Sequence, residues 1–254
     1  MTQSTTSDDL KALFAYPFQD TNWKNKFLIG SLVVLAGYII PIIPFFVVYG
    51  YMAQIMRRII VERGQPYLPE WDDWGKMFMD GLKLLGALLV YSLPIFVLFC
   101  ASYLFIFLTI GVSASVEASS DAPSGLAAVG PLVGTFGFFC MFGIIMIFAL
   151  ALGLVSPAIM GHIIATDEFS AAFRFGEWWS IFRANLGGFF IAYVIVLALY
   201  SAFSFALSIM YLTIILCCFL PIIMGPVTYY MLLISAVVFG QAYRDGVDKL
   251  QNAT

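Results

Sequence analysis

Acid–base and metal chemistry both need titratable side chains that converge, and the apolar stretches of this sequence contain very few. Between residues 84 and 161 the only charged side chains are Glu117 and Asp121, and residues 186–243 contain no Asp, Glu, Lys, Arg or His. A proton relay or an ion-coupled carrier usually keeps at least one carboxylate inside the membrane. This distribution argues against secondary active transport and offers no acid–base pair to an enzyme.

A group of carboxylates lies before the first long apolar stretch. Its members are Glu70, Asp72, Asp73 and Asp80. Oxygen ligands of this kind suit Mg²⁺ or Ca²⁺. Successive residues of a helix point about 100° apart, so Asp72 and Asp73 do not face one site. A solvated face that complements a helix N-terminus is the preferred interpretation.

His162 is the only histidine in the chain. It has no second histidine to share a metal with, and the nearest carboxylate in sequence is Asp167. We interpret it as an interfacial residue and not as a catalytic one. The sequence therefore predicts no catalytic residue, no cofactor and no metal site, and hence a protein that is not an enzyme.

The composition indicates that the chain is dissolved in lipid. Of its 254 residues 62% are hydrophobic and 11% are charged, with a mean hydropathy of +0.96. Soluble domains are about 45–50% apolar and about 25% charged. Only helices and closed barrels satisfy their backbone in a bilayer, and the apolar runs here are long and continuous. The sequence predicts an all-α polytopic membrane protein, with residues 1–254 as a single membrane domain.

Four apolar segments are long enough to cross the hydrocarbon core, which takes about 20 helical residues. They are residues 82–111, 129–160, 186–210 and 214–240. Earlier in the chain, the pair Pro41 and Pro44 divides another apolar stretch, because proline ends or kinks a helix. We expect two short helices there, over residues 25–40 and 43–62, which makes about six transmembrane helices. The first arm is short for a full crossing, so a re-entrant hairpin remains an alternative.

The positions of the basic residues predict the orientation. All twelve Lys and Arg lie in four places, which are residues 11–26, 57–83 and 174–183, and Arg244 with Lys249. The positive-inside rule places these four regions in the cytoplasm. We therefore expect a multi-pass protein of the cell (inner or plasma) membrane. Its N-terminal segment, residues 1–24, and its tail, residues 241–254, are both expected to be cytoplasmic.

Short similarities divide the six expected helices into three hairpin units. Trp23, Trp74 and Trp178 each stand four residues before an apolar residue at the start of a unit. The return helices begin or pivot at proline, and Pro157-Ala-Ile-Met-Gly161 resembles Pro221-Ile-Ile-Met-Gly225. Each unit starts on the same side, as parallel repeats do.

The segments between hairpins are expected to be cytoplasmic amphipathic linkers. Trp71, Trp74 and Phe78 have the spacing of one helix face, and Pro69 suits the first turn of that helix. The second linker starts with Thr166 as a capping residue and continues through Phe169 and Phe173.

These linkers and the arginines before them supply the predicted contacts with lipid or a partner. Such helices lie in the membrane interface, and basic residues attract anionic head groups. The predicted contact residues are Arg57, Arg58, Arg63, Trp71, Trp74, Phe78, Phe169 and Phe173.

One run of residues resembles a known family. Leu68-Pro-Glu-Trp-Asp-Asp-Trp74, with Gly50-Tyr51, Tyr16-Pro17, Asp20 and Trp23, is similar to the prokaryotic domain-of-unknown-function family numbered 4013. More distantly, residues 157–185 look like the membrane domain of glycerophosphodiester phosphodiesterase-type inner-membrane families. These resemblances imply a helical membrane topology and no established activity.

Two functions remain to be compared. The first is a non-catalytic accessory, scaffold or lipid-interacting protein that acts through the bilayer, a membrane-protein partner or a homo-oligomer, with no nucleic acid involved. The alternative is a channel or facilitator for ions or small solutes, because helices broken by proline are tolerated where they line a cavity.

Overall fold

The computed structural model describes residues 7–117, 126–211 and 220–253, and every element among them is a helix. The first four helices are α1 (Ser7–Ala15), η1 (Tyr16–Phe18), α2 (Trp23–Ile39) and α3 (Ile43–Ile60). They are followed by α4 (Trp74–Glu117), α5 (Leu126–Thr166), η2 (Phe169–Phe173), α6 (Phe175–Ala184), α7 (Leu186–Tyr211) and α9 (Leu220–Ala253). The predicted all-α class is confirmed for the described residues.

Four of these helices are long and apolar enough to cross a membrane. The qualifying stretches are Trp74–Ser115 of α4, Val129–Thr166 of α5, Leu186–Met210 of α7 and Ile222–Asn252 of α9. The two helices of the first predicted hairpin fall short of this standard. With 17 residues, α2 is about 26 Å long, less than a hydrocarbon core of about 30 Å. The 18 residues of α3 include Arg57 and Arg58 in the last turn.

Several helices extend beyond their predicted bounds. Helix α4 begins at Trp74 and not at residue 82, and α5 continues to Thr166 and not to 160. Helix α9 runs through the predicted tail as far as Ala253. The predicted start of the last span, residue 214, lies outside the described residues. Hydropathy marks where a helix is apolar, but backbone hydrogen bonding continues into polar sequence until something stops it.

The chain divides into two compact units. Unit 1 comprises Met1–Ala87 and Leu154–Thr254, and unit 2 comprises Leu88–Gly153. The two boundaries fall within α4 and within α5.

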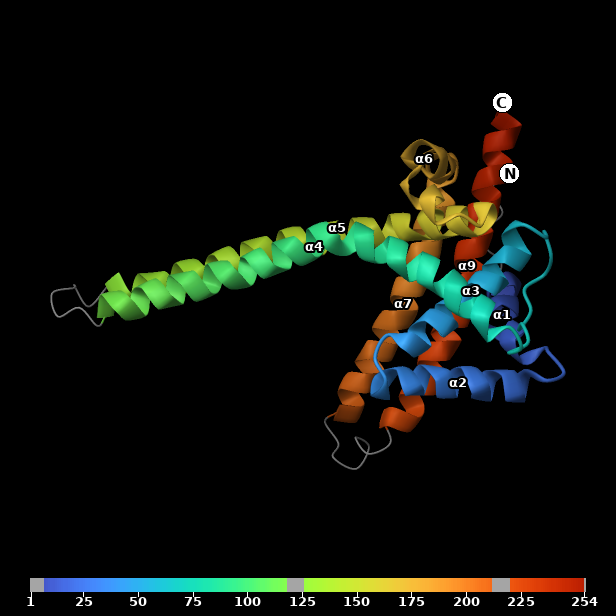
Figure 1. Cartoon of the computed structure of the whole chain (residues 1–254), viewed down its shortest axis with the longest axis horizontal. Coiled ribbons are helices and arrows are strands. Elements are labelled where there is room, and N and C mark those ends of the chain that lie inside the picture. Colours follow the sequence, from blue (N-terminus) through green and yellow to red (C-terminus); the bar gives the residue numbers. More distant parts are fainter. Residues whose placement is uncertain (1–6, 118–125, 212–219, 254) are drawn as a thin grey trace. The chain divides into compact units, whose positions relative to one another are not determined.

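The core of unit 1 is built on α9, which packs against α2, α3, α6 and α7. Helix α3 runs parallel to α9, because Tyr51 lies beside Tyr229 and Ile59 lies beside Gly240. Figure 1 shows α2 crossing α9. The apolar side chains on the inner faces of α3 and α9 are buried, and their close packing stabilises the contact between the two helices.

Two glycines allow α3 and α4 to cross closely within unit 1. A Cβ atom on Gly50 would collide with the backbone carbonyl of Met77, and one on Gly81 would collide with that of Phe46. Backbone cannot move aside as a flexible side chain can. The crossing therefore requires glycine on both helices, and it fixes the first turns of α4 against α3.

Unit 2 is an antiparallel pair formed by the remaining parts of α4 and α5, which lie side by side in Figure 1. Its seam contains small residues. Gly130 faces Ser113, Gly134 faces Thr109, and Gly137 lies against the ring of Phe105. Most of the large apolar side chains on the outer surface are exposed, as expected for helices that contact lipid.

The first linker differs from the predicted helix. Residues 61–73 contain no helix, so Pro69 is not in a first helical turn, and Trp71 is not on a helix with Trp74 and Phe78. The helix begins only at Trp74, after Asp73, whose carboxylate accepts a 3.0 Å hydrogen bond from the backbone N–H of Lys76. The backbone carbonyls of this linker bind side chains from other helices instead.

The second linker also differs from the prediction in where its helices begin. Helix α5 ends at Thr166, and the next residue, Asp167, has a left-handed φ of 58°. Phe169 and Phe173 then lie on the 3-10 helix η2, whose N-cap is Glu168 and not Thr166. Helix α6 follows from Phe175.

Candidate functional site

A buried lysine lies at the start of α2. The ammonium of Lys26 is 2.7 Å from Asp20 Oδ2 and 2.8 Å from Glu70 Oε1, and it donates a 2.8 Å hydrogen bond to the carbonyl of Leu68. The Lys26 side chain is 7% exposed. We call these four residues the Lys26 cluster. Because an ammonium has three N–H donors, all of them are in use, and Lys26 is not available as a nucleophile or base.

The Leu68–Trp74 loop closes over this lysine through aromatic side chains. Trp71 stacks on Tyr51 with ring centroids 4.3 Å apart, and its indole N–H donates to the carbonyl of Lys26 at 2.9 Å. The Tyr51 hydroxyl donates to the carbonyl of Pro69, also at 2.9 Å. Trp74 in turn donates to the carbonyl of Trp71. The loop is therefore held to both α2 and α3.

The N-terminal helices bring Asp20 to the cluster. The Tyr16 hydroxyl donates to the carbonyl of Leu233 at 2.9 Å, and Tyr230 donates to the carbonyl of Phe14 at 3.0 Å, so this segment is docked on α9. Hydrogen bonds from Lys26, and then from the backbone N–H of Asn22, lower the pKa of Asp20 below its ordinary value. Asp20 therefore remains a carboxylate at neutral pH.

A surface hollow of about 290 Å³ opens beside the Lys26 cluster. Helix α2 and the residue before it contribute Asn22, Asn25, Lys26 and Ile29, and the loop contributes Glu70, Trp71 and Asp72. Amides, carboxylates and an indole ring therefore face one space. Such groups can hold a small polar ligand, but they do not include a general acid–base pair.

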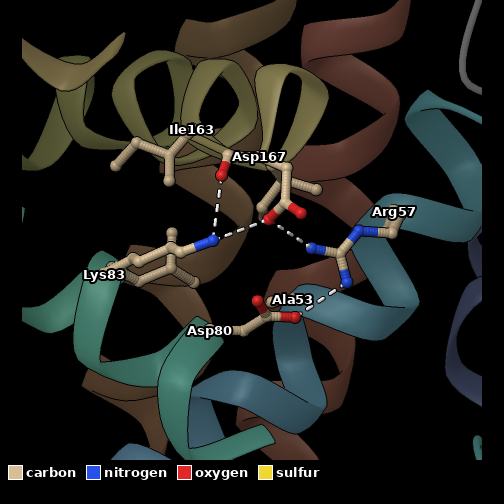
Figure 2. Close-up of a pocket in the computed structure, with 8 residues that line it drawn as sticks. Ala53, Arg57, Asp80, Lys83, Ile163 and Asp167 are labelled. Carbon is tan, nitrogen blue, oxygen red and sulfur yellow. Dashed lines mark hydrogen bonds and ion pairs between the residues drawn. The ribbon is translucent and has the colours of Figure 1, made fainter. Parts of the chain in front are cut away.

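A second group of charges, the Arg57 cluster, joins α3, α4 and the end of α5 (Figure 2). Arg57 is 2.7 Å from the buried carboxylate of Asp80 and 3.3 Å from that of Asp167. Lys83 donates to the carboxylate of Asp167 at 2.8 Å and to its carbonyl at 2.9 Å. The Lys83 hydrogen bond lowers the pKa of Asp167. The cavity among these residues is about 10 Å³, room for about one water molecule, so the cluster is a structural link.

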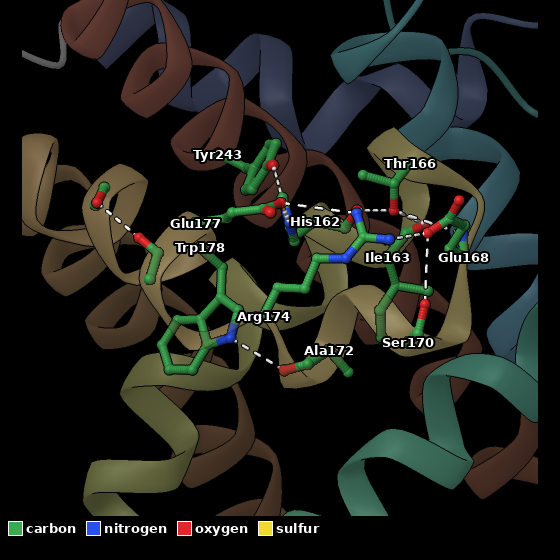
Figure 3. Close-up of polar contacts among 12 residues, drawn as sticks. His162, Ile163, Thr166, Glu168, Ser170, Ala172, Arg174, Glu177, Trp178 and Tyr243 are labelled. Carbon is green, nitrogen blue, oxygen red and sulfur yellow. Dashed lines mark hydrogen bonds and ion pairs between the residues drawn. The ribbon is translucent and has the colours of Figure 1, made fainter.

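A third group, the His162 cluster, joins α5, α6 and α9 (Figure 3). The Nδ1 atom of His162 is 2.9 Å from the Tyr243 hydroxyl, and Nε2 is 2.9 Å from a carboxylate oxygen of Glu177. Arg174 pairs with Glu168 and lies 3.8 Å from Glu177. A carboxylate–histidine–hydroxyl row is a proton-relay arrangement, but Tyr243 is 1% exposed and out of reach of a substrate. The row links helices.

The eight predicted contact residues do not form one surface in the structure. Arg57 belongs to the Arg57 cluster, Arg58 pairs with Glu62, and Arg63 contacts the carboxylate of Asp248 at 2.6 and 2.8 Å. All three arginines are thus paired within the protein.

The predicted aromatic contacts are also dispersed. Trp71 and Trp74 lie together at the Lys26 cluster, whereas Phe78 packs edge-on against Phe46. Phe169 and Phe173 contact each other and are both exposed.

Sequence reasoning missed the partners of two buried polar residues, Lys26 and His162. Lys26 and Glu70 lie far apart in the chain, as do His162 and Tyr243, and no local spacing indicates either pair. The residues of the family resemblance were the available signal. Tyr16, Asp20, Tyr51 and the Leu68–Trp74 run all meet around Lys26 and the adjoining part of α9.

Comparison with protein families gives one result. A model described as a protein of unknown function, DUF4013, matches residues 32–212. No curated protein and no solved structure matches the chain. The distant similarity to glycerophosphodiester phosphodiesterase-type membrane domains remains a prediction. Since the matched residues make up well over half of the sequence, the chain belongs to the DUF4013 family.

Proposed function

We propose that this protein is a non-catalytic accessory or scaffold protein of the cell membrane that acts through lipids or a membrane-protein partner. The main support is the state of its charged groups. In the Lys26, Arg57 and His162 clusters the charged side chains are paired with one another and tie helices together. Groups committed in this way give the fold a fixed shape and leave little for chemistry.

The surface of the protein supports the same proposal. In α4, α5 and α7 the most apolar stretches are only 6% buried within the protein. Phe169 and Phe173 add exposed aromatic side chains outside those stretches, where an interfacial contact with lipid or a partner would form. An apolar surface of this extent needs lipid or another protein to cover it.

We further propose that the first hairpin is re-entrant and that both termini are cytoplasmic. Helix α2 is too short for a full crossing, and the hairpin tip consists of Ile39, Ile40, Pro41, Ile42 and Ile43, with its four isoleucines exposed. A tip on the far side would place these isoleucines in water. A tip that stops within the hydrocarbon keeps them in an apolar environment. The basic residues at both ends of the hairpin then stay on one side of the membrane. With α4, α5, α7 and α9 this arrangement gives four full crossings.

Affinity purification from mildly solubilised membranes tests the function. A reproducible partner or an enriched lipid is expected, and replacing Phe169 and Phe173 by serine should weaken its capture. Val61→Ser, an exposed apolar position at the end of α3, is the matched control. Recovery of neither a partner nor a lipid would contradict the proposal. A solute or ion leak through reconstituted liposomes would instead favour the channel function.

A further inference from the structure

The hollow beside Lys26 has an excess of negative charge. Lys26 is neutralised by Asp20 and Glu70, and its three N–H donors are all in use. The Glu70 side chain is nevertheless 64% exposed, and the exposed carboxylate of Asp72 lines the same hollow. The hollow therefore attracts a cation more readily than an anion.

The other lining groups are suited to an ammonium group that is attached to a hydrogen-bond acceptor. Trp71 lines the hollow, and the ring centroid of Trp74 lies 5.4 Å from that of Trp71, so two indole rings stand near the carboxylates. Indole rings attract ammonium groups through the negative face of the ring. The side chains of Asn22 and Asn25 bring amide N–H donors, which bind phosphate oxygens.

The hollow also continues into an apolar surface along α2. Asn22, Asn25 and Ile29 line it from one side of the helix start. Leu28 and Leu32, three and seven positions after Asn25, belong to the same side and are 58% and 54% exposed. A ligand held in the hollow would thus have an uncovered apolar track beside it.

We propose that this hollow binds the head group of an aminophospholipid. The ammonium lies between Glu70, Asp72 and the indole of Trp71, the phosphodiester accepts hydrogen bonds from Asn22 and Asn25, and an acyl chain follows Leu28 and Leu32. A volume of about 290 Å³ is close to the lower end of ligand pockets, about 300–1,000 Å³, and suits a head group. This proposal rests on the proposed function and names one of its lipids.

Native mass spectrometry of the detergent-purified full chain tests this assignment. The protein is titrated with phosphatidylethanolamine, with phosphatidylglycerol of the same acyl composition, and with soluble O-phosphoethanolamine. We expect one phosphatidylethanolamine to bind with a Kd at least tenfold lower than that of phosphatidylglycerol, and O-phosphoethanolamine not to compete at lipid concentrations. Asp72→Asn should raise the Kd for phosphatidylethanolamine about fivefold or more. Asp245→Asn removes an exposed carboxylate near the C-terminal end of α9 and should leave the Kd for phosphatidylethanolamine unchanged.

Three results would overturn the proposal. They are equal affinity for the two lipids, equal loss of affinity in the two variants, and competition by O-phosphoethanolamine as strong as by the lipid, which would identify a soluble amine as the ligand. Asp72 is exposed and its carboxylate accepts a local hydrogen bond from the backbone of Asp73, so the variant is expected to fold. An unchanged unfolding temperature checks this. Partner capture through Phe169 and Phe173 is measured separately, so the proposed function can stand if the hollow binds no lipid.

Discussion

The indole N–H of Trp71 donates a 2.9 Å hydrogen bond to the backbone carbonyl of Lys26, 45 residues earlier in the chain. The same ring stacks on Tyr51, which belongs to the next helix. One side chain of a non-helical loop thus connects α2 to α3.

This contact makes Trp71 important for stability. Trp71→Ala removes the stacking and the hydrogen bond, and we expect the free energy of unfolding to fall by about 3 kcal/mol. Trp71→Phe keeps a ring over Tyr51 and should lose only about 1 kcal/mol, the usual contribution of one hydrogen bond. Chemical unfolding in detergent, followed by circular dichroism, measures both. Equal losses in the two variants would show that the stacking contributes nothing.

The charge of Lys26 is predicted to be needed for folding. Lys26→Met has a similar length but leaves the Asp20 and Glu70 carboxylates without their cation. Removal of one partner of a buried ion pair costs about 3–5 kcal/mol, and the exposure of Glu70 places the expected loss below that range, near 2 kcal/mol. Lys24→Met, a charge change at an exposed position of the same helix, is the control. A Lys26→Met protein as stable as the control would exclude this role of the cluster.

The pKa of Asp20 predicts an acid-sensitive contribution to stability. Because the folded protein lowers this pKa, the stabilisation is fully present above the ordinary pKa of about 4 and is lost as the pH falls through the folded value. Asp20→Asn should therefore unfold at a lower temperature than the natural chain at pH 7. The difference should shrink below pH 4. Melting curves between pH 7 and pH 3 give the comparison, and a difference that is constant with pH would contradict it.

The crossing of α3 and α4 predicts a strong effect of one methyl group. Gly50→Ala places its Cβ against the Met77 carbonyl, and we expect a loss of about 2 kcal/mol or more. Gly111→Ala is the matched control, because nothing lies within 4 Å of the added atom. It should be neutral, or stabilising by up to about 1 kcal/mol because alanine favours the helix. The unfolding temperatures of the two variants are compared with that of the natural chain. Equal shifts in both variants would be incompatible with the close crossing.

The His162 cluster predicts how α6 is held. His162→Ala removes the contacts of Glu177 and Tyr243 with the imidazole ring, so α6 should open more often from α5 and α9. Hydrogen exchange of residues 175–184 is the measurement, with faster exchange expected in the variant. Ser180→Ala, an exposed change on the same helix, should leave exchange nearly unaltered. Unchanged protection in His162→Ala would mean that the buried side chains of α6, Trp178, Ile181 and Phe182, hold the helix without the His162 cluster.

The parts of the fold that the sequence predicted are those with local signals. The segment 186–210 matches α7 to within one residue, and Pro41 and Pro44 mark the boundary between α2 and α3, because hydropathy and proline act over a few residues. The helix expected to start at Pro69 was wrong for the opposite reason. The carbonyls of Leu68 and Pro69 bind Lys26 and Tyr51, and these tertiary hydrogen bonds replaced the helical ones.

The candidate site could be predicted only in part. The Leu68–Trp74 run identified the right segment, and two of the predicted contact residues, Trp71 and Trp74, do lie at the Lys26 cluster. In the sequence, Lys26 is only one of the basic residues that predict the orientation. Its carboxylate partner Glu70 comes from a distant part of the chain, and periodicity within either segment contains no information about that contact.

The hydrogen bonds of Tyr16 to Leu233 and of Tyr230 to Phe14 have a consequence for biosynthesis. They join residues 217 and 216 positions apart, so α1 and η1 receive these contacts only after α9 has been synthesised. Until then neither hydrogen bond can form. A chain that stops before α9 therefore leaves the Tyr16 hydroxyl and the Phe14 carbonyl without these two partners.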